Sequence, residues 1–282
     1  MAQVSRAIKR TFLKAMPTGV ADALLRKYPN LRKAAPAGQN FVFDGYCSGI
    51  RVNIDTRYKV ERIMWSGTYE PKLAKFLRAR NTHGWVCLDI GANVGAISLL
   101  LAKVVGPEGK VIAVEPGPPN VARLRKNFEL NPALAARSEI IACGMSNIPG
   151  QLWWAEEEGN PGNAMLGDKG THCIPVRTVD DVVREQALER LDFAKIDVEG
   201  MELQVMQGGK ESFERFRPIL YFETLSRYGD VHAGSNFQLI ESFLIRECGY
   251  ALFRISNSGQ LMSLSGRAMD DYTVAVHASM KP

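Results

Sequence analysis

The residues best placed to do chemistry lie around a glycine-spaced turn between two apolar segments. An apolar segment containing Asp89 runs into a turn that carries Gly91, Asn93 and Gly95, and the next apolar segment ends at Glu115. A strand, a glycine turn, a helix and a second strand that ends on a carboxylate are typical of a nucleoside-binding βαβ unit. Glycine lets the backbone approach a ligand that a Cβ atom would exclude. The two hydroxyls of a ribose could each donate to one oxygen of Glu115.

The spacing of the glycines limits which nucleoside ligand fits. A dinucleotide site needs a G-x-G-x-x-G turn, whose second glycine lets a pyrophosphate rest on the helix N-terminus. This turn has Asn93 where that glycine would stand, and the sequence contains no G-x-x-x-x-G-K-[ST] motif. A phosphate-free ligand with an adenosine and a small zwitterionic tail fits better, and S-adenosylmethionine is the common example.

A second group of acidic residues follows two later strand-like segments. Asp197 and Glu199 come directly after an apolar segment, beside a glycine, and Glu223 closes the next one. Open α/β sheets bind ligands at the carboxyl ends of their strands, so these residues are expected at one edge. Two neighbouring carboxylates can create a base, share a divalent metal, or be neutralised by Lys195, and the sequence leaves these three outcomes open. Glu202, in the first turn of the next helix, is interpreted as helix-dipole stabilisation.

Strands and helices alternate along most of the chain, which predicts a parallel sheet with helices on both faces. The expected strands are 85–90, 111–115, 139–143, 151–154, 171–177, 193–197 and 218–224, then an antiparallel pair, 249–255 and 272–277. The expected helices are 71–80, 97–105, 118–130, 180–188, 201–216 and 237–248, and a hairpin is expected over 41–54. The glycine-rich stretch 156–170 is expected to be a long loop. Together with Trp153, Trp154 and residues 227–236, it is expected to shape the pocket for the substrate.

Basic residues are concentrated at the N-terminus of this chain of 282 residues. Residues 1–40 contain eight Lys and Arg against one Asp, although the whole chain carries a formal net charge of +5. We interpret 1–40 as a basic helical arm and 41–282 as the catalytic domain, with 41–84 as its extension. The arm is expected to pack on the domain, and weak contact with a membrane surface is the alternative. Five scattered cysteines and no expected signal peptide favour a cytoplasmic location.

The motifs together resemble the FkbM family of S-adenosylmethionine-dependent methyltransferases. The similarity rests on Asp89-Ile-Gly-Ala-Asn-Val-Gly95, Glu115-Pro116, Lys195-Ile-Asp-Val-Glu-Gly-Met-Glu202 and Gly208-Gly209, with weaker matches at 69–71 and 177–181. It spans roughly residues 65–225. The resemblance implies a class I methyltransferase, Rossmann-like α/β fold with a seven-stranded, mostly parallel sheet in the order 3-2-1-4-5-7-6.

The resemblance also implies methyl transfer from S-adenosylmethionine to a hydroxyl of a sugar, polyketide, glycan or related small metabolite. The donor would be bound by residues carried over from the family's motifs: Glu70, Asp89, Gly91, Asn93, Gly95, Glu115, Pro116, Gly144 and Met145. Glu115 would hold the ribose, and Gly144 and Met145 would border the adenine.

A hydroxyl is too weak an acid to ionise first, so a carboxylate must take its proton as the new bond forms. Asp197 is the first choice of base, followed by Glu199 and Glu223. A divalent metal is conceivable but is not predicted, no nucleic-acid partner is expected, and the oligomeric state is left open. The competing interpretations are a non-catalytic cofactor-binding or scaffold protein and, less favoured, an NAD-dependent oxidoreductase.

Overall fold

The computed structural model describes residues 38–65, 67–156, 164–224, 237–264 and 272–280. The proposed basic arm therefore lies almost entirely outside the described residues. The chain divides into two compact units, residues 1–70 and 71–282. The second unit contains most of the residues that the sequence singles out.

The first unit is built on the predicted hairpin. Strands β1 (Asn40–Tyr46) and β2 (Ile50–Asp55) pair antiparallel, and helix α3 (Lys59–Met64), which the sequence analysis did not predict, follows them. Apolar side chains from all three elements, among them Phe43, Ile54 and Met64, are fully buried.

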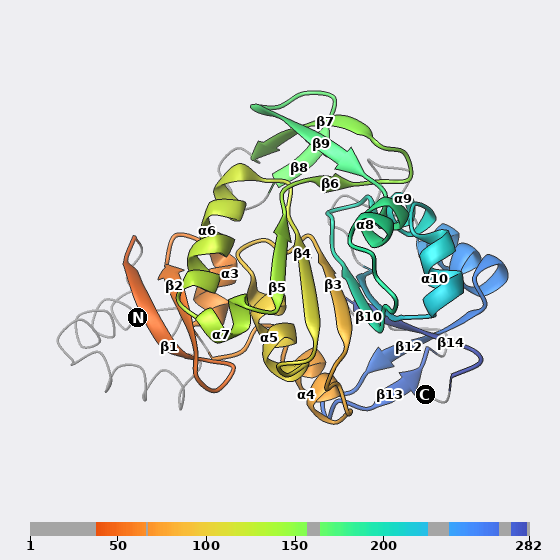
Figure 1. Cartoon of the computed structure of the whole chain (residues 1–282), viewed down its shortest axis with the longest axis horizontal. Helices are drawn as coiled ribbons and strands as arrows, with labels where there is room; N and C mark the ends of the chain where they lie inside the picture. Colours follow the sequence, from red (N-terminus) through yellow and green to blue (C-terminus); the bar gives the residue numbers. More distant parts are fainter. Residues whose placement is uncertain (1–37, 66, 157–163, 225–236, 265–271, 281–282) are drawn as a thin grey trace, which may run out of the picture. The chain divides into compact units, whose positions relative to one another are not determined.

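The second unit is organised around an eight-stranded sheet (Figure 1). Its order is β13-β12-β14-β11-β10-β3-β4-β5. The strands are β3 (Val86–Ile90), β4 (Lys110–Val114), β5 (Ser138–Ile141), β10 (Phe193–Ile196), β11 (Ile219–Glu223), β12 (Tyr250–Ile255), β13 (Leu261–Ser263) and β14 (Tyr272–His277). Strands β5, β4, β3, β10 and β11 are parallel, and β14 runs antiparallel to both β11 and β12. The order 3-2-1-4-5-7-6 is confirmed, and β13 adds an edge strand that was not predicted.

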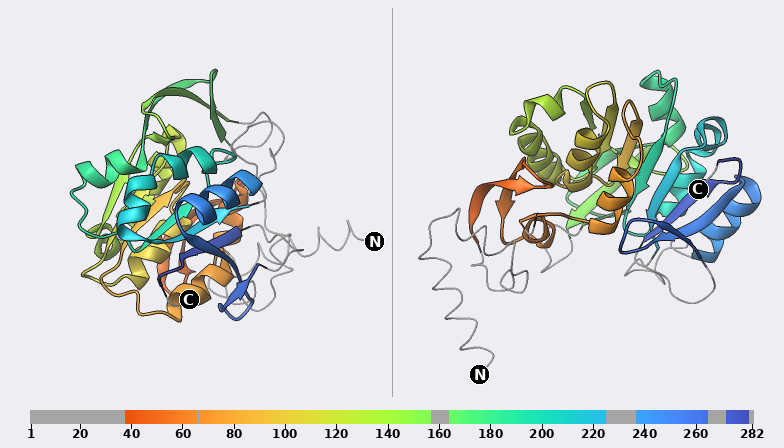
Figure 2. Two further views of the ribbon diagram at one scale, coloured as in Figure 1. Left: turned by 90° about the vertical axis from the view of Figure 1, so that its right-hand side faces the viewer. Right: turned by 90° about the horizontal axis from the view of Figure 1, so that it is seen from below.

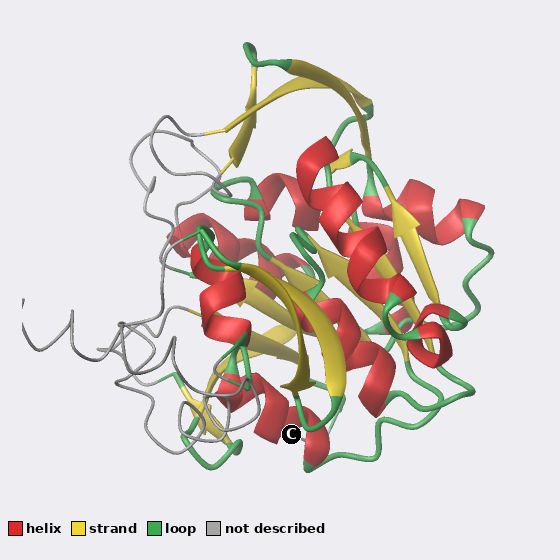
Figure 3. Cartoon of the chain, turned by 90° about the vertical axis from the view of Figure 1, so that its left-hand side faces the viewer, coloured by secondary structure: helices red, strands yellow, loops and turns green. Residues whose placement is uncertain are grey.

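Helices lie on both faces of this sheet, as Figures 2 and 3 show. They are α4 (Pro71–Arg78), α5 (Ala96–Val104), α6 (Pro118–Glu129), α7 (Pro132–Ala135), α8 (Val179–Glu185), α9 (Glu202–Gln207), α10 (Lys210–Phe216), α11 (Phe237–Ser242) and the π-helical η3 (Phe243–Glu247). The core between α8–η3 and the sheet contains fully buried Leu88, Ala194 and Phe222. This packing fixes the positions of the strand ends.

The helix predicted over 201–216 is two helices. Gly208 and Gly209 separate α9 from α10, and a Cβ atom on Gly208 would collide with the backbone carbonyl of Ser146. The carboxylate of Asp180 accepts hydrogen bonds from the Ser212 backbone N–H at 2.9 Å and from the Glu211 N–H at 3.3 Å, which satisfies the start of α10. The glycine pair is therefore explained by close packing at a corner.

A second, smaller sheet follows β5 and lies beyond the carboxyl ends of the neighbouring strands (Figure 1). Its order is β6-β9-β7-β8, with β6 (Gly144–Met145), β7 (Gly150–Glu156), β8 (Ala164–Gly167) and β9 (His172–Arg177). The prediction of a loop over 156–170 was wrong at β8, whose residues pair antiparallel with 153–156 of β7. Strand β8 has only four residues and no alternating pattern that marks it as a strand. Residues 157–163 lie outside the described part.

Candidate active site

The glycine turn after β3 is built from left-handed backbone conformations. Gly91, Asn93 and Gly95 have φ values of 77°, 50° and 88°. Asparagine is one of the few non-glycine residues that adopt this conformation readily, which explains why it can stand in the turn. A Cβ atom on Gly91 would collide with the backbone carbonyl of Asp197, and one on Gly95 would lie 2.5 Å from Leu124 Cδ1. Packing within the protein thus already requires both glycines, whatever ligand they approach.

Glu115 is held in place by three donors. Its Oε2 accepts a hydrogen bond from the Asn93 N–H at 2.8 Å. Its Oε1 accepts from the Gly117 N–H at 2.9 Å and from Asn120 Nδ2 at 3.1 Å. The side chain is buried, and burial raises its pKa while these hydrogen bonds act to lower it. Three of about four lone-pair positions are filled, so one ribose hydroxyl fits on Oε2 more easily than one on each oxygen.

An ion-pair row crosses the sheet from β3 to β10. Lys195 Nζ lies 3.3 Å from Asp89 Oδ1 and 3.5 Å from Asp197 Oδ2, and it donates to the backbone carbonyl of Gly91 at 2.6 Å. Ser98 Oγ of α5 donates to the other oxygen of Asp89 at 2.5 Å. Asp89 and Lys195 are both buried. The cation therefore ties the glycine turn to the end of β10, and the predicted neutralisation by Lys195 applies to Asp197.

The turn after β10 is shaped by Glu202. Its Oε1 accepts hydrogen bonds from the N–H groups of Val198 at 3.0 Å and Gly200 at 3.2 Å, and the side chain is almost fully buried. Within this turn Glu199 has a φ of 53°, a conformation that is uncommon for a non-glycine residue. Strained backbone of this kind concentrates at functional sites. Glu202 thus has a structural part beyond stabilising a helix dipole.

Glu223 ends β11 beside this turn. Residues Ile196 and Phe222 are register partners in the parallel β10–β11 pair, so the residues that follow them, Asp197 and Glu223, are neighbours at the edge. Glu223 Oε2 is buried and has no hydrogen-bond partner among the described residues. Burial, and then the charges of Asp197, Glu199 and Glu202, raise the pKa of Glu223 to about 9, although Lys195 acts to lower it. A carboxyl group in this state is protonated at neutral pH.

Tyr272 of β14 is a member of the site that the sequence analysis missed. Its hydroxyl donates to Asp197 Oδ2 at 2.8 Å. Its ring stacks on Tyr221, with 4.8 Å between the centroids and 6° between the planes, and it is the register partner of Glu223. Residues 272–277 were predicted only as a strand, and nothing in the local pattern signals a partner 75 residues away.

The remaining predicted donor-binding residues occupy several places. Glu70 ends the first unit with a φ of 48°, and Pro116 is half-buried beside Glu115. Gly144 and Met145 form β6, and the buried Met145 side chain belongs to the hydrophobic core on the α8–η3 side. Any contact that residue 145 makes with an adenine would therefore come from its backbone.

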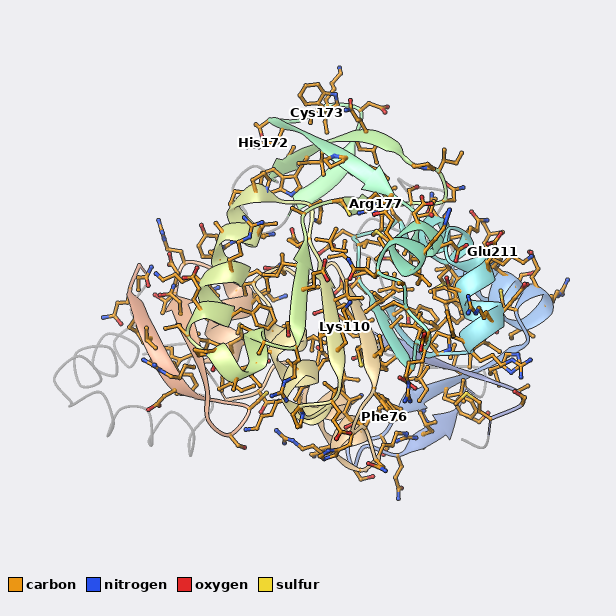
Figure 4. The ribbon with its side chains drawn as sticks, viewed as in Figure 1. Phe76, Lys110, His172, Cys173, Arg177 and Glu211 are labelled. Carbon is orange, nitrogen blue, oxygen red and sulfur yellow. The ribbon has the colours of Figure 1, made fainter. Side chains whose placement is uncertain are left out.

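The small sheet sends one tryptophan toward the Glu115 loop. A Cβ atom on Gly117 would lie 2.6 Å from Trp154 Nε1, and the Trp154 side chain is almost fully buried. Trp153, on the opposite face of β7, is 42% exposed. The ring of His172, labelled in Figure 4 with its neighbour Cys173, contacts the ring of Trp154. The two tryptophans thus differ, and Trp154 lies at the donor side of the predicted pocket.

Two further kinds of feature are absent from the described ranges. No helix there is both long and apolar enough to cross a bilayer. Within the same ranges no group of three or more His, Cys, Asp and Glu side chains is arranged to hold a metal ion.

The glycine turn, the buried Glu115 and the carboxyl groups after β10 thus lie at one edge of a mostly parallel sheet. The family model described as "Methyltransferase FkbM domain" matches residues 89–252, more than half of the chain. The chain belongs to the FkbM methyltransferase family. The match contains Asp89, Glu115, Asp197 and Glu223, whereas Tyr272 lies beyond its end.

Curated relatives that are named methyltransferases match about half of the chain. The chain is 30% identical over 167 residues to methyltransferase sdnD of Sordaria araneosa, covering 47% of this chain and 64% of that protein. It is 30% identical over 151 residues to the 2-O-methyltransferase NoeI of Sinorhizobium fredii, covering 48% and 61%. It is 24% identical over 153 residues to the hexuronic acid methyltransferase AglP of Haloferax volcanii, covering 53% and 56%. In each case the match spans less than two thirds of the relative.

Among solved structures, the chain resembles the methyltransferase FkbM from Methylobacillus flagellatus KT. The TM-score is 0.48 at 18% identity, over 77% of this chain and 52% of the other.

Proposed function

We propose that this protein transfers a methyl group from S-adenosylmethionine to a hydroxyl of a sugar or glycan. The observation that carries the proposal is the pair of unlike carboxyl sites at one sheet edge, with Glu115 held by three hydrogen bonds and Glu223 surrounded by other acids. The class of acceptor is inferred from two relatives, one named a 2-O-methyltransferase and the other a hexuronic acid methyltransferase.

The residues present fit the donor. Glu115 retains a lone-pair position on Oε2 for a ribose hydroxyl. The carboxylates after β10 and β11 would favour a cationic centre at that edge, because opposite charges attract most strongly where water is excluded. When bound, the donor supplies a methyl group on a sulfonium, and alignment of that group with the acceptor oxygen would provide much of the rate gain.

We propose Glu223 as the group that takes the acceptor's proton. Asp197, the first choice from sequence, is held by Lys195 and accepts a hydrogen bond from Tyr272 on the same oxygen. Both contacts are made to Oδ2, so this oxygen is already engaged within the protein. Glu223 has a buried oxygen without such a partner in the described residues. Glu223 would take the hydroxyl proton as the acceptor oxygen gains the methyl group, which a bound sulfonium donor would supply, leaving as a neutral thioether. Asp197 and Glu199 orient the acceptor.

The proposal is tested with methyl-labelled S-adenosylmethionine and a panel of hexoses, hexuronic acids and their glycosides. Label is expected in an ether that nuclear magnetic resonance places on a ring oxygen. Parallel calorimetry with S-adenosylmethionine and NAD tests the oxidoreductase alternative, and heat is expected with the first alone. Binding of NAD, or transfer to nitrogen acceptors only, would contradict the proposal. The absence of any donor binding would instead support a scaffold function.

A further inference from the structure

The surroundings of Glu223 disfavour a negative charge on its buried oxygen in the free protein. Several titratable or charged groups face this carboxyl or its neighbour Asp197: Asp197 and Glu199 from the turn after β10, Glu202 from α9, Lys195 from β10 and Tyr272 from β14. Three of these are acids, and the one cation in this group is already within 3.5 Å of both Asp89 and Asp197. A further negative charge on Glu223 is therefore poorly compensated.

We propose that Glu223 carries a proton in the free protein and releases it to solvent when the sulfonium donor binds, so that donor binding itself creates the base. The inference rests on the proposed function, since it takes the donor to be S-adenosylmethionine. A positive charge near the acidic edge supplies compensation that the described residues do not, and an opposite charge within about 4–6 Å lowers the pKa of a carboxyl group by about 1–3 units.

The proposed release of a proton on donor binding also accounts for the protons over one complete round of methyl transfer. Methylation of a hydroxyl by a sulfonium yields an ether, a neutral thioether and one proton. Here that proton leaves at donor binding, and the hydroxyl proton then replaces it on Glu223. The state after transfer, with a neutral thioether and a protonated Glu223, has the charge that the site holds most easily. The structure thus favours an ionised base only while the methyl group is still on sulfur.

Calorimetry tests this proton release directly. S-adenosylmethionine and S-adenosylhomocysteine are each titrated into the protein at pH 8, in two buffers with different enthalpies of ionisation. With a free pKa of about 9 and the range of lowering given above, donor binding is expected to release between about 0.4 and 0.9 proton. S-adenosylhomocysteine, which lacks the sulfonium charge, is expected to release close to none. The affinity for the donor should also rise with pH between about 6 and 9, while that for S-adenosylhomocysteine stays flat.

Two matched variants assign the proton. Glu223→Gln should still bind both ligands, but without any dependence of the enthalpy on the buffer. Glu139→Gln makes the same chemical change at an exposed carboxylate on β5, which pairs with Lys110 (labelled in Figure 4) at the start of β4, and should behave like the wild type. If Glu223→Gln fails to fold, the contrast between the two ligands in the wild-type protein still decides the matter.

The outcomes separate the inference from the proposed function. Donor binding with no more proton release than S-adenosylhomocysteine, or release that persists in Glu223→Gln, overturns the inference and leaves the proposed function standing. If neither ligand binds the wild-type protein, the proposed function itself fails.

Discussion

Glu115 directly follows β4 and Glu223 ends β11 of the same sheet, yet their surroundings are opposite. Burial raises the pKa of both carboxyl groups. Glu115 accepts three hydrogen bonds, two of them from backbone N–H groups, whereas Glu223 has a buried oxygen without a partner in the described residues and faces other acids. Burial alone therefore does not distinguish the carboxylate proposed to bind the donor from the one proposed to react. The hydrogen-bond donors around each carboxyl group make the difference, because hydrogen bonds to the charged form fix the position and the charge of the group.

The largest effect is expected from a substitution of Glu223, the proposed base. Glu223→Gln removes the proton acceptor but keeps the shape of the side chain, so the turnover number should fall by about 10²- to 10⁴-fold. Binding of S-adenosylhomocysteine should change little, because the three hydrogen-bond donors that hold Glu115 are unchanged. Single-turnover methyl transfer measures the first quantity and calorimetry the second. Near wild-type turnover would return Asp197 to first place as the base.

Lys195 influences both carboxyl groups, because its charge acts against the rise in the pKa of Glu115 and of Glu223. Lys195→Met would leave Asp89, which is fully buried, without its cation. Breaking a buried pair in this way costs about 3–5 kcal/mol of unfolding free energy, which thermal or denaturant unfolding would detect. Lys210→Met is the control, since its pair with Glu247 is exposed and screened by solvent, so the loss should be much smaller. Equal losses in the two variants would show that the buried row is not structural.

Glu115→Gln addresses the binding side. A glutamine must turn its NH₂ group toward at least one of the hydrogen-bond donors that now point at the carboxylate. The unsatisfied contact should weaken the binding of S-adenosylmethionine by about 1–3 kcal/mol, or about 5- to 150-fold. The turnover number at saturating donor should be nearly unchanged, which is the reverse of Glu223→Gln. A variant that lost turnover but kept its affinity would contradict the division of roles.

Much of this arrangement could be predicted from sequence because strand ends are readable. Asp89 lies near the end of one apolar segment, Asp197 follows another and Glu223 closes a third, which places these residues at one edge as soon as the sheet is known to be parallel. The order of the strands came from the resemblance to a family, and the structure confirms it.

The partners of these residues could not be predicted in the same way. Tyr272 reaches Asp197 from a strand that is distant in sequence, and Asn120 contacts Glu115 from within a helix. Neither residue stands in a pattern that indicates hydrogen bonding. The break between α9 and α10 depends on the packing of Gly208 against Ser146, which is a tertiary contact. Sequence periodicity predicts elements, but it does not predict which side chains meet across them.

The pH dependence of stability offers a smaller test of the same contrast. The pKa of Glu223 is raised from 4.5 in the unfolded chain to about 9 in the folded protein. Its stabilising contribution is therefore fully present below pH 4.5 and is lost as the pH rises through 9. Glu223→Gln removes this dependence, so its melting temperature relative to the wild type should rise between pH 5 and pH 9. Thermal unfolding over this range measures the difference. A constant difference would mean that Glu223 is ionised in the free protein.

The smallest expected effect concerns how Asp197 is held. Tyr272→Phe keeps the ring that stacks on Tyr221 but removes the hydroxyl that donates to Asp197. The loss of one such hydrogen bond costs about 1–1.5 kcal/mol, so the turnover number should fall by about 5- to 12-fold, with little change in donor affinity. Tyr221→Phe is the matched control, since it keeps the stack and leaves the Tyr272 hydroxyl in place. If both variants lost turnover equally, the tyrosines would serve packing alone, and Asp197 would be positioned by Lys195 without help from β14.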